Sequence, residues 1–343
     1  MAVYTQVDDA ELIAFLATYQ IGDLLSCKGI AEGVENSNYY LHTSAGSYIL
    51  TLYEKRVAAT DLPFFLGLME HLARRGVTCP QPVRNRAGVA LGRLAGRPAV
   101  IVTFLDGYSV HHPEVAHCSA LGETLARLHL ASADFDMQRA NALSVGAWRA
   151  LFAPSAARAD EVEAGLRETV EAELDYLEEN WPRDLPSGVI HADLFPDNAF
   201  FLGDRMSGVI DFYFACNDAY AYDLAICLNA WCFDDAHRFQ LEKGRALRAA
   251  YRRVRPLTAA ELDAFPTLAR GAAIRFLLTR YVDWLNVPEG ALVKPKDPRE
   301  YLAKLRFHQT AGAGRDEARV DLDRWGLFGK SRPRRLGRHS AFR

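Results

Sequence analysis

HADLFPDN, at residues 191–198, places a histidine, two aspartates and an asparagine within eight residues. Largely apolar runs flank this stretch on both sides, at 187–190 and 199–202. A further run, VIDF at 209–212, follows a turn at 203–205. Two strand-like runs joined by a short turn form a hairpin. We therefore expect the end of the VIDF run to lie beside the polar loop.

The spacing of the polar groups matches the needs of phosphoryl transfer. That reaction uses a carboxylate to orient the acceptor hydroxyl and accept its proton, and an amide and a second carboxylate to hold Mg²⁺. In kinases the first carboxylate and the amide lie on one loop, as D-x-x-x-x-N. Asp193 and Asn198 have this spacing, and Asp211 ends the following strand. An isolated D-x-x-x-x-N is common in ordinary loops, but the complete pattern is much more specific.

Two other polar residues of the stretch have open roles. His191 could act as a base, but its place in the pattern favours structural support, in which it packs under the loop and hydrogen-bonds the backbone or Asp211. Asp197 directly precedes Asn198, and either faces solvent or contacts the substrate.

Composition narrows the class of protein. The chain has 343 residues, ordinary globular composition and a net charge of −3, which argues against generic nucleic-acid binding. The N-terminus does not resemble a signal peptide, and no apolar run reaches the ~18 residues of a membrane span. The six cysteines form no CxxC pair, so we expect reduced thiols, no zinc site and a cytoplasmic protein. We also expect no membrane partner. The oligomeric state is left open.

The first part of the chain predicts a small antiparallel sheet with one or two helices. Amphipathic or capped patterns predict the helices, and runs rich in aromatic and β-branched residues predict the strands. The expected helices are 8–19 and 62–76, and the expected strands are 36–43, 46–54 and two within 86–104. The continuous apolar run at 99–104 should be a central, buried strand. We place a lobe boundary at the break that follows, which gives a first lobe of residues 1–105.

The rest of the chain predicts a larger, mostly helical lobe, residues 106–330. Apolar residues recur at helical spacing in most of its segments. The expected helices are 114–132, 160–181, 218–254, 259–286 and 297–313, and the expected strands are 199–204 and 206–214. The arginine-rich segment 331–343 is expected to be a disordered tail, with a nucleic-acid-binding arm as the alternative. The fold class is α+β with two lobes.

Several segments resemble a known family of small-molecule kinases. HADLFPDN with VIDF is similar to the aminoglycoside phosphotransferase and choline kinase type, which shares the protein-kinase fold. GVENSNYYL at 33–41, YILTLYEKR at 48–56 and the segment 62–83 resemble the bacterial homoserine kinases of that fold. The resemblance covers about residues 1–315. It implies ATP and Mg²⁺ as cofactors, and L-homoserine as the acceptor of the γ-phosphate in threonine biosynthesis.

The resemblance also implies roles for single residues. Asp193 corresponds to the catalytic base, and Asn198 and Asp211 to the Mg²⁺ ligands. The stretch 33–38 corresponds to the turn over the ATP phosphates, and its residues Gly33, Asn36, Ser37 and Asn38 offer backbone N–H groups and short polar side chains. An ordinary loop is the alternative for this turn. Phe104 and Leu105 lie where the hinge would contact adenine, unless they are plain core residues.

One position departs from the general kinase pattern. A lysine on the third strand, paired with a helix glutamate, normally holds the α- and β-phosphates, but Thr51 stands at that place here. The resembled homoserine kinases also tend to have Thr there. Lys55 and Arg56 could supply the missing charge or be a solvated pair, and Glu70 could be the helix glutamate or merely exposed.

The acceptor site has weaker signals. A homoserine carboxylate needs a cation near the catalytic base, and Arg275 and Arg280 are candidates, although each could instead form an inter-helix salt bridge. Asp197 is the third candidate for a substrate contact. Asp223 begins an Asp-Leu-Ala pattern that we expect to hold the fold.

Three other functions compete with a homoserine kinase. The first is a kinase of another small alcohol, such as an aminoglycoside, choline or a thiosugar. The second is a metal-dependent hydrolase that uses His191, Asp193 and Asp211, although no second ligand cluster completes its site. The third is a non-catalytic nucleotide-binding pseudokinase, which the presence of Asp193, Asn198 and Asp211 argues against.

Overall fold

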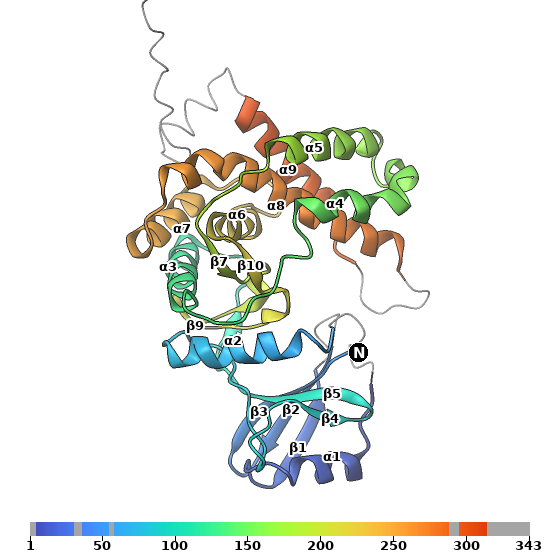
Figure 1. Cartoon of the computed structure of the whole chain (residues 1–343), viewed down its shortest axis with the longest axis vertical. Coiled ribbons are helices and arrows are strands. Elements are labelled where there is room, and N and C mark those ends of the chain that lie inside the picture. The colour runs from blue at the N-terminus through green and yellow to red at the C-terminus, as the bar shows by residue number, and fades with distance from the viewer. Residues whose placement is uncertain (1–4, 31–35, 55–57, 288–294, 314–343) are drawn as a thin grey trace, which may run out of the picture.

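A computed structural model describes residues 5–30, 36–54, 58–287 and 295–313. They form a small part built on one β-sheet and a larger, mostly helical part (Figure 1). The predicted tail at 331–343, Gly33, Lys55 and Arg56 lie outside the described residues.

The small part contains a five-stranded antiparallel sheet in the order β1-β2-β3-β5-β4. The strands are β1 (Leu24–Gly29), β2 (Ser37–Thr43), β3 (Gly46–Leu52), β4 (Gly92–Leu94) and β5 (Arg97–Thr103). The predicted strands correspond to β2, β3, β4 and β5. β1 was missed, because its burial does not alternate along the strand and the sequence therefore lacks the period of two that identifies strands.

Both faces of this sheet are covered, and β5 shows the consequence most clearly. Ala99 and Ile101 point into a core shared with helix α1 (Asp9–Leu16), whereas Val100 and Val102 point into the core that contains helix α2 (Leu62–Arg74). Successive side chains of a strand face opposite sides, so a strand buried on both faces is apolar throughout. This explains the continuous run predicted to be a central strand.

The helix α2 lies between the sheet and the helical part (Figure 1). Its buried face, with Phe65, Leu68 and Leu72, belongs to the same core as the large helices. Helix α1 caps the opposite face of the sheet, and the Asp8 side chain accepts hydrogen bonds from the N–H groups of Ala10 and Glu11 at its start. Asp8 is thus the N-cap of the helix predicted over 8–19.

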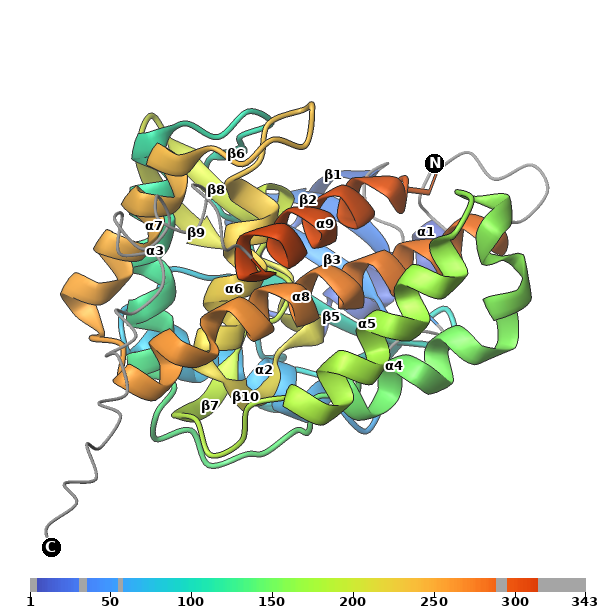
Figure 2. The ribbon, with the colours of Figure 1, turned by 90° about the horizontal axis from the view of Figure 1, so that it is seen from above.

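Seven α-helices form the bulk of the larger part within the described residues. They are α3 (Val115–Ala131), α4 (Val145–Phe152), α5 (Leu166–Asn180), α6 (Tyr220–Trp231), α7 (Leu241–Val254), α8 (Ala259–Leu285) and α9 (Arg299–Ala313). The long α8 packs against α4, α5, α6 and α9, and Figure 2 shows it running alongside them. Helices α3 and α7 approach so closely that a Cβ on Gly122 would overlap the Leu247 carbonyl.

Two small sheets support the polar loop. β7 (Ser187–Ile190) pairs with β10 (Cys216–Ala219), and β8 (Ala199–Leu202) lies between β6 (Tyr108–Ser109) and β9 (Arg205–Val209). The chain leaves the five-stranded sheet after Thr103 and enters β6 at Tyr108. The lobe boundary after residue 105 stays a prediction, and residue 105 belongs to the connection between β5 and β6.

Three predicted elements were wrong in extent. The segment 218–254 is not one helix, because a turn at Asp234 and a bridge between Phe233 and Phe239 separate α6 from α7. The helix predicted over 160–181 begins only at Leu166, because a 3-10 segment occupies residues up to Glu161 and Gly165 adopts φ 79° directly before the helix. The strand predicted over 206–214 ends at Val209.

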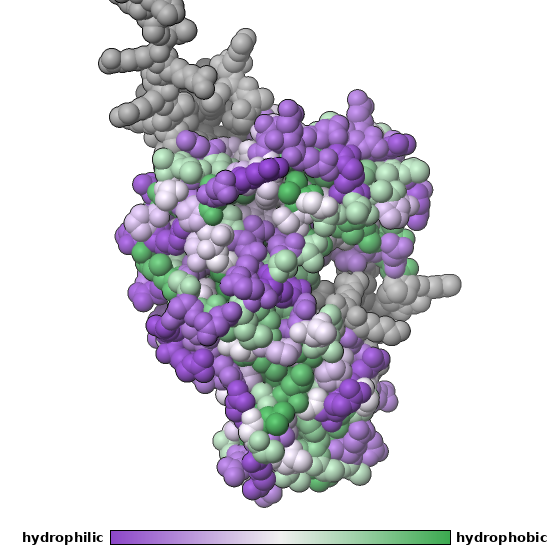
Figure 3. Space-filling view, in the orientation of Figure 1, coloured by the Kyte–Doolittle hydropathy of each residue, from purple (hydrophilic) through white to green (hydrophobic). Residues whose placement is uncertain are grey.

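Hydrophilic residues predominate over the helical part on the face shown in Figure 3. Among the residues that the structure describes, no helix combines the length and apolarity that crossing a membrane requires.

Candidate active site

The loop at 191–198 brings Asp193 and Asn198 into direct contact. The loop runs from β7 through a 3-10 turn, η2 (Pro196–Asn198), into β8. The Asn198 Nδ2 group donates a 2.8 Å hydrogen bond to the Asp193 carbonyl and approaches its carboxylate Oδ2 at 3.3 Å. This arrangement closes the loop on itself. It also leaves the amide oxygen of Asn198 as the atom that can face a cation.

Asp211 is brought beside Asn198 by the pairing of β8 with β9. Ala199 pairs with Val209, and the Ile210 N–H donates a 3.0 Å bond to the Asn198 carbonyl. Asp211 itself adopts φ 62° and begins the 3-10 turn η3 (Phe212–Phe214). Left-handed backbone at a residue other than glycine is uncommon and costs energy. The hairpin thus carries all three predicted polar groups to one place.

A buried carboxylate holds the backbone of the loop. Asp223, in the first turn of α6, accepts hydrogen bonds from the N–H of His191 at 2.8 Å and of Ala192 at 2.9 Å. It also accepts one from His129 Nε2 at 3.0 Å. Burial raises the pKa of Asp223, but the hydrogen bond and charge of His129 and the contacts with His191 outweigh it, so the pKa lies below its usual value. Ala192 is held at φ 63° by this contact.

His191 has both ring nitrogens engaged. Its Nε2 donates to the Ile210 carbonyl at 2.9 Å, and its Nδ1 accepts from the Asp193 N–H at 3.3 Å. Burial lowers the pKa of His191, chiefly because a charged ring would lose its hydration. A neutral ring with both nitrogens bonded ties Asp193 to the strand before Asp211.

Two further carbonyls of the loop accept hydrogen bonds from side chains. Trp231 Nε1 donates to the Leu194 carbonyl at 2.8 Å, and Arg275 Nη1 donates to the Ala192 carbonyl. Arg275 is only 2% exposed and lies beneath the loop. Buried backbone groups need such partners, and here they come from helices α6 and α8.

Hydroxyl groups occupy the place where the strand lysine is absent. The Thr51 hydroxyl donates to Asn38 Oδ1 at 2.7 Å, and the Tyr53 hydroxyl donates to the Tyr213 hydroxyl at 3.0 Å. Burial raises the pKa of Tyr213 to about 12, and the negative charge of Asp211 also raises it. No local pattern connects Tyr53 with Tyr213, because 160 residues separate them in the chain.

The described part of the predicted phosphate turn is tied to the sheet. Asn36 Oδ1 accepts from the Glu54 N–H at 3.3 Å, and the Ser37 hydroxyl donates to Glu54 Oε1 at 2.8 Å. Glu70, the candidate for an ion pair with a strand cation, forms a salt bridge of 2.7 Å with Arg84.

The predicted hinge residues differ in their surroundings. Phe104 is 41% exposed and contacts Tyr40 edge-on, with 5.5 Å between ring centroids. It is therefore not a core residue. Leu105 packs against β9, where a Cβ added to Gly208 would come within 2.7 Å of it.

The three predicted substrate contacts lie apart from one another. Asp197 is exposed and pairs with Lys296 at 3.1 Å. Arg280 pairs with Glu300 at 2.5 Å. Arg275 is the residue under the loop, so its Nη1 is committed to the backbone.

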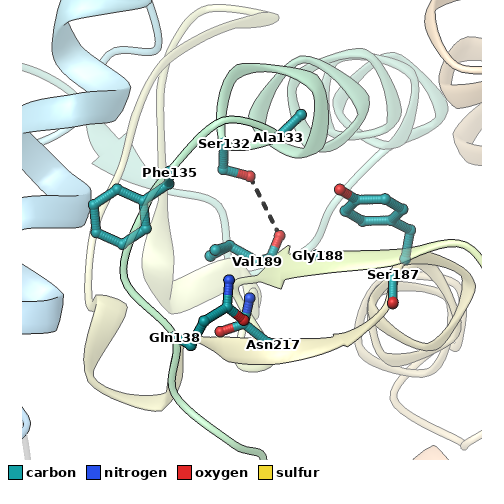
Figure 4. A pocket seen from close by; sticks show the side chains of 9 residues that line it. Ser132, Ala133, Phe135, Gln138, Ser187, Gly188, Val189 and Asn217 are labelled. Atoms are coloured by element: carbon teal, nitrogen blue, oxygen red, sulfur yellow. Dashed lines mark hydrogen bonds between the residues drawn. The ribbon is translucent and has the colours of Figure 1, made fainter.

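A separate pocket of about 200 Å³ lies at the far end of β7, between the end of α3 and the β7–β10 pair (Figure 4). In Figure 4 the Ser132 hydroxyl points to the Val189 carbonyl, with which it forms a 3.4 Å hydrogen bond. None of the predicted catalytic residues lines this pocket.

The donor set at the loop fits Mg²⁺ shared with a nucleotide. Over the described residues, no three His, Cys, Asp or Glu side chains are grouped so that they could hold a metal ion on their own. Mg²⁺ is usually bound by one or two carboxylates together with substrate phosphates and water. The Asp211 carboxylate and the Asn198 amide offer oxygen atoms of the kind that this ion prefers.

Comparison with known proteins agrees with this chemistry. Residues 26–257 match the model of the phosphotransferase enzyme family. A homoserine kinase from Methylobacterium sp. (strain 4-46) is 69% identical, over 90% of this chain and 96% of the relative. One from Bradyrhizobium sp. (strain ORS 278) is 66% identical, over 92% and 98%.

Solved structures share the fold at low sequence identity. An amicoumacin kinase in complex with AMP-PNP and Ca²⁺ has a TM-score of 0.64 at 17% identity, over 88% of this chain and 92% of that one. A choline kinase from Cryptosporidium parvum Iowa II has a TM-score of 0.65 at 13% identity, over 93% and 98%. These likenesses confirm the predicted two-part α+β fold.

Proposed function

The chain belongs to the phosphotransferase enzyme family, and from this premise we propose that it is an ATP-dependent homoserine kinase. It transfers the γ-phosphoryl group of ATP to the hydroxyl of L-homoserine and forms O-phosphohomoserine, a step of threonine biosynthesis. The observation that carries the choice of acceptor is the 69% identity to a homoserine kinase over 96% of that relative.

Asp193 acts as the catalytic base in this proposal. Its carboxylate orients the acceptor hydroxyl and accepts its proton as the new phosphate ester forms. The nearby His191 cannot readily take this role, since both of its ring nitrogens are bonded and burial lowers its pKa. Asp193 is only partly buried, which leaves it accessible to an acceptor.

Asn198 and Asp211 would hold Mg²⁺ on the phosphates. When bound, the ion would neutralise negative charge that builds up on the transferred group. The protein contributes the positions of these two side chains, which the hydrogen bonds of Asn198 to Asp193 and of Ile210 to Asn198 hold together. Holding reacting groups in place before the reaction lowers its barrier.

The nucleotide would lie against the end of the sheet. Phe104 offers an exposed aromatic face after β5 for the adenine, together with Leu105. Gly33, Asn36, Ser37, Asn38 and Thr51 are the proposed contacts to the phosphates. Thr51 cannot replace the positive charge of a strand lysine, so the phosphates depend more on Mg²⁺ and on backbone N–H groups.

The competing acceptors are other small alcohols. The solved relatives act on such compounds, but at 13–21% identity they share only the fold. The predicted cytoplasmic location, and the absence of nucleic-acid and membrane partners, stay predictions.

A panel assay tests the function. Purified protein with Mg-ATP is offered L-homoserine, L-serine, L-threonine, choline and an aminoglycoside, and ADP release is followed with ³¹P NMR of the product. We expect turnover with L-homoserine above all others. Turnover of another acceptor without turnover of homoserine would overturn the proposed acceptor.

A variant pair tests the role of Asp193. Asp193→Ala should lower kcat by about a thousandfold or more while the affinity for ATP, measured by calorimetry, changes little. The matched control is Asp204→Ala, which removes an exposed carboxylate from the turn between β8 and β9. Activity of Asp193→Ala within tenfold of the parent protein would rule out the assigned role.

A further inference from the structure

Three charged side chains of α8 and α9 form one cluster. Arg280 Nη1 donates to Glu300 Oε2 at 2.5 Å, and Lys304 Nζ donates to Glu300 Oε1 at 2.6 Å. Arg280 is 8% exposed and Lys304 is 3% exposed. We call these residues the Arg280 cluster.

The Arg280 cluster has formal charges of two cations and one anion. Although burial opposes the ionisation of Glu300, the charges of Lys304 and Arg280 lower its pKa to about 2. Glu300 is therefore ionised at neutral pH. A surplus positive charge in a buried position is costly unless an anion approaches it.

The Arg280 guanidinium has N–H donors beyond the one that binds Glu300. A guanidinium carries five N–H donors, and the single hydrogen bond of this side chain to the described residues uses Nη1. The contrast is Arg270 on the same helix, which forms a two-pronged pair with Glu173 through Nε at 2.7 Å and Nη2 at 2.6 Å. Arg280 can therefore bind a second carboxylate, whereas Arg270 already holds Glu173 in a bidentate pair.

An aromatic cluster connects Arg280 to the catalytic loop. The Arg280 guanidinium lies over the Tyr301 ring, 4.5 Å from its centroid. The Tyr301 ring lies 5.3 Å from Phe276 and 6.4 Å from Phe195, which follows Asp193 by two residues. The guanidinium is thus one aromatic layer away from the loop that carries the base.

The Tyr301 side chain lies among charged groups of both the Arg280 cluster and the catalytic loop. Burial raises the pKa of Tyr301, and the ionised groups that act on it are Arg280, Glu300, Asp193 and Arg275. Its hydroxyl is buried and has no hydrogen-bond partner within the structure. A buried polar group without a partner is unusual, and here it lies in the fields of both Asp193 and Arg280.

We propose that Arg280 binds the α-carboxylate of the acceptor and so selects an amino acid over an amino alcohol. This inference rests on the proposed function and names the residue that recognises the acid group. In an amino acid with a terminal hydroxyl, the hydroxyl and the carboxylate lie at opposite ends of the molecule. When the hydroxyl contacts the base, the carboxylate therefore needs a cation a short distance away from the base. Arg275 is less suited, because it is only 2% exposed beneath the loop, where its Nη1 donates to the Ala192 carbonyl.

The test compares two acceptors that differ only in the carboxylate. 3-Amino-1-propanol has the hydroxyl, chain length and amine of homoserine and lacks the acid group. For each variant, kcat/KM is measured for L-homoserine and for 3-amino-1-propanol, and the ratio of the two values is taken. If 3-amino-1-propanol turns over too slowly, its inhibition constant replaces its kcat/KM. Because both values come from one preparation, partial misfolding cancels in the ratio.

Arg280→Gln should lower this ratio by about 100-fold, as expected for the loss of charge-assisted hydrogen bonds, with KM for ATP unchanged. Arg280→Lys should restore part of the ratio, because it keeps the charge and loses the planar fork. The control Arg270→Gln removes a buried arginine from the same helix and should leave the ratio unchanged.

The outcomes separate this inference from the proposed function. If the parent protein does not phosphorylate homoserine, both fail. Two results would overturn only the inference, provided that the parent protein phosphorylates homoserine. In the first, Arg280→Gln leaves both the ratio and KM for homoserine unchanged. In the second, Arg270→Gln lowers the ratio as much as Arg280→Gln does. If the amino alcohol neither reacts nor inhibits, the decisive result is KM for homoserine, which must rise at least tenfold in Arg280→Gln with KM for ATP unchanged.

Discussion

The hydroxyl of Tyr53 donates a 3.0 Å hydrogen bond to the hydroxyl of Tyr213, across 160 residues of sequence. Tyr53 directly follows β3 of the five-stranded sheet, and Tyr213 follows the proposed metal ligand Asp211 by two residues. The rings meet edge-on, with centroids 5.2 Å apart. This contact joins the proposed nucleotide-binding side of the site to the proposed metal-binding side.

Tyr213→Phe removes one hydroxyl and leaves the ring in place. We expect KM for ATP to rise about three- to tenfold and the unfolding free energy to fall by about 1 kcal/mol, because the buried Tyr53 hydroxyl loses its acceptor. KM for homoserine should not change. Steady-state kinetics and urea unfolding measure both effects. Tyr40→Phe is the control, since it removes a hydroxyl bonded to Ser47 in the same sheet. Equal effects of the two variants on KM for ATP would contradict the prediction.

Asp223→Asn replaces one carboxylate oxygen, which accepts hydrogen bonds from backbone N–H groups, by an NH₂ group, which donates. We expect kcat to fall by about 100-fold, because the loop that carries Asp193 shifts. The unfolding free energy should fall by about 3 kcal/mol, because the buried pair with His129 is broken. The control is Asp218→Asn on β10, which alters the contact of Asp218 with Asn141. It should leave kcat unchanged. A destabilised Asp223→Asn protein with near-normal kcat would show that the contact serves stability alone.

Buried histidines should make the protein sensitive to mild acid. Burial lowers the pKa of His308 to about 3 and also lowers the pKa values of His129 and His191. The unfolded chain binds these protons near pH 6.5, whereas the folded chain binds them only at lower pH. Stability is therefore complete above about pH 6.5 and declines as the pH falls toward 3, by up to about 1.4 kcal/mol per pH unit for each histidine.

Urea unfolding between pH 7.5 and pH 5 measures this slope. The expected sign is a lower unfolding free energy at pH 5. Replacing His308, whose Nε2 lies 2.6 Å from Asn229 Oδ1, by Gln should reduce the slope by about one proton. An unchanged slope in that variant would mean that His308 does not contribute.

The contact between α3 and α7 should tolerate no side chain at Gly122. Gly122→Ala places a methyl group against the Leu247 carbonyl, and we expect a loss of about 2–3 kcal/mol. Gly146→Ala is the matched control, because a Cβ in α4 there has nothing within 4 Å and should stabilise by about 0.5–1 kcal/mol. Thermal unfolding of both variants gives the comparison, and similar melting temperatures would contradict it.

Local spacing explains what the sequence predicted well. Asp193, Asn198 and Asp211 lie on one loop and one hairpin, so their proximity follows from short-range geometry. The apolar run of β5 and the Asp8 cap of α1 are local signals of the same kind.

Contacts between distant segments explain what was missed. Tyr53 meets Tyr213, and Arg280 meets Glu300, only after the helices and sheets have packed, and no local pattern marks such pairs. The break between α6 and α7 was missed because helix-forming residues occur on both sides of the Asp234 turn.

The anchors of the catalytic loop also fix when an enzyme of this design can become active during its synthesis. The loop at 191–198 leaves the ribosome before Asp223, Trp231 and Arg275, which bind its backbone. A nascent chain that ends before α8 therefore carries every proposed catalytic side chain but lacks one support of the Ala192 carbonyl. Phosphate transfer should begin only after α8 has docked, so a growing chain stays inactive until most of the protein has been made.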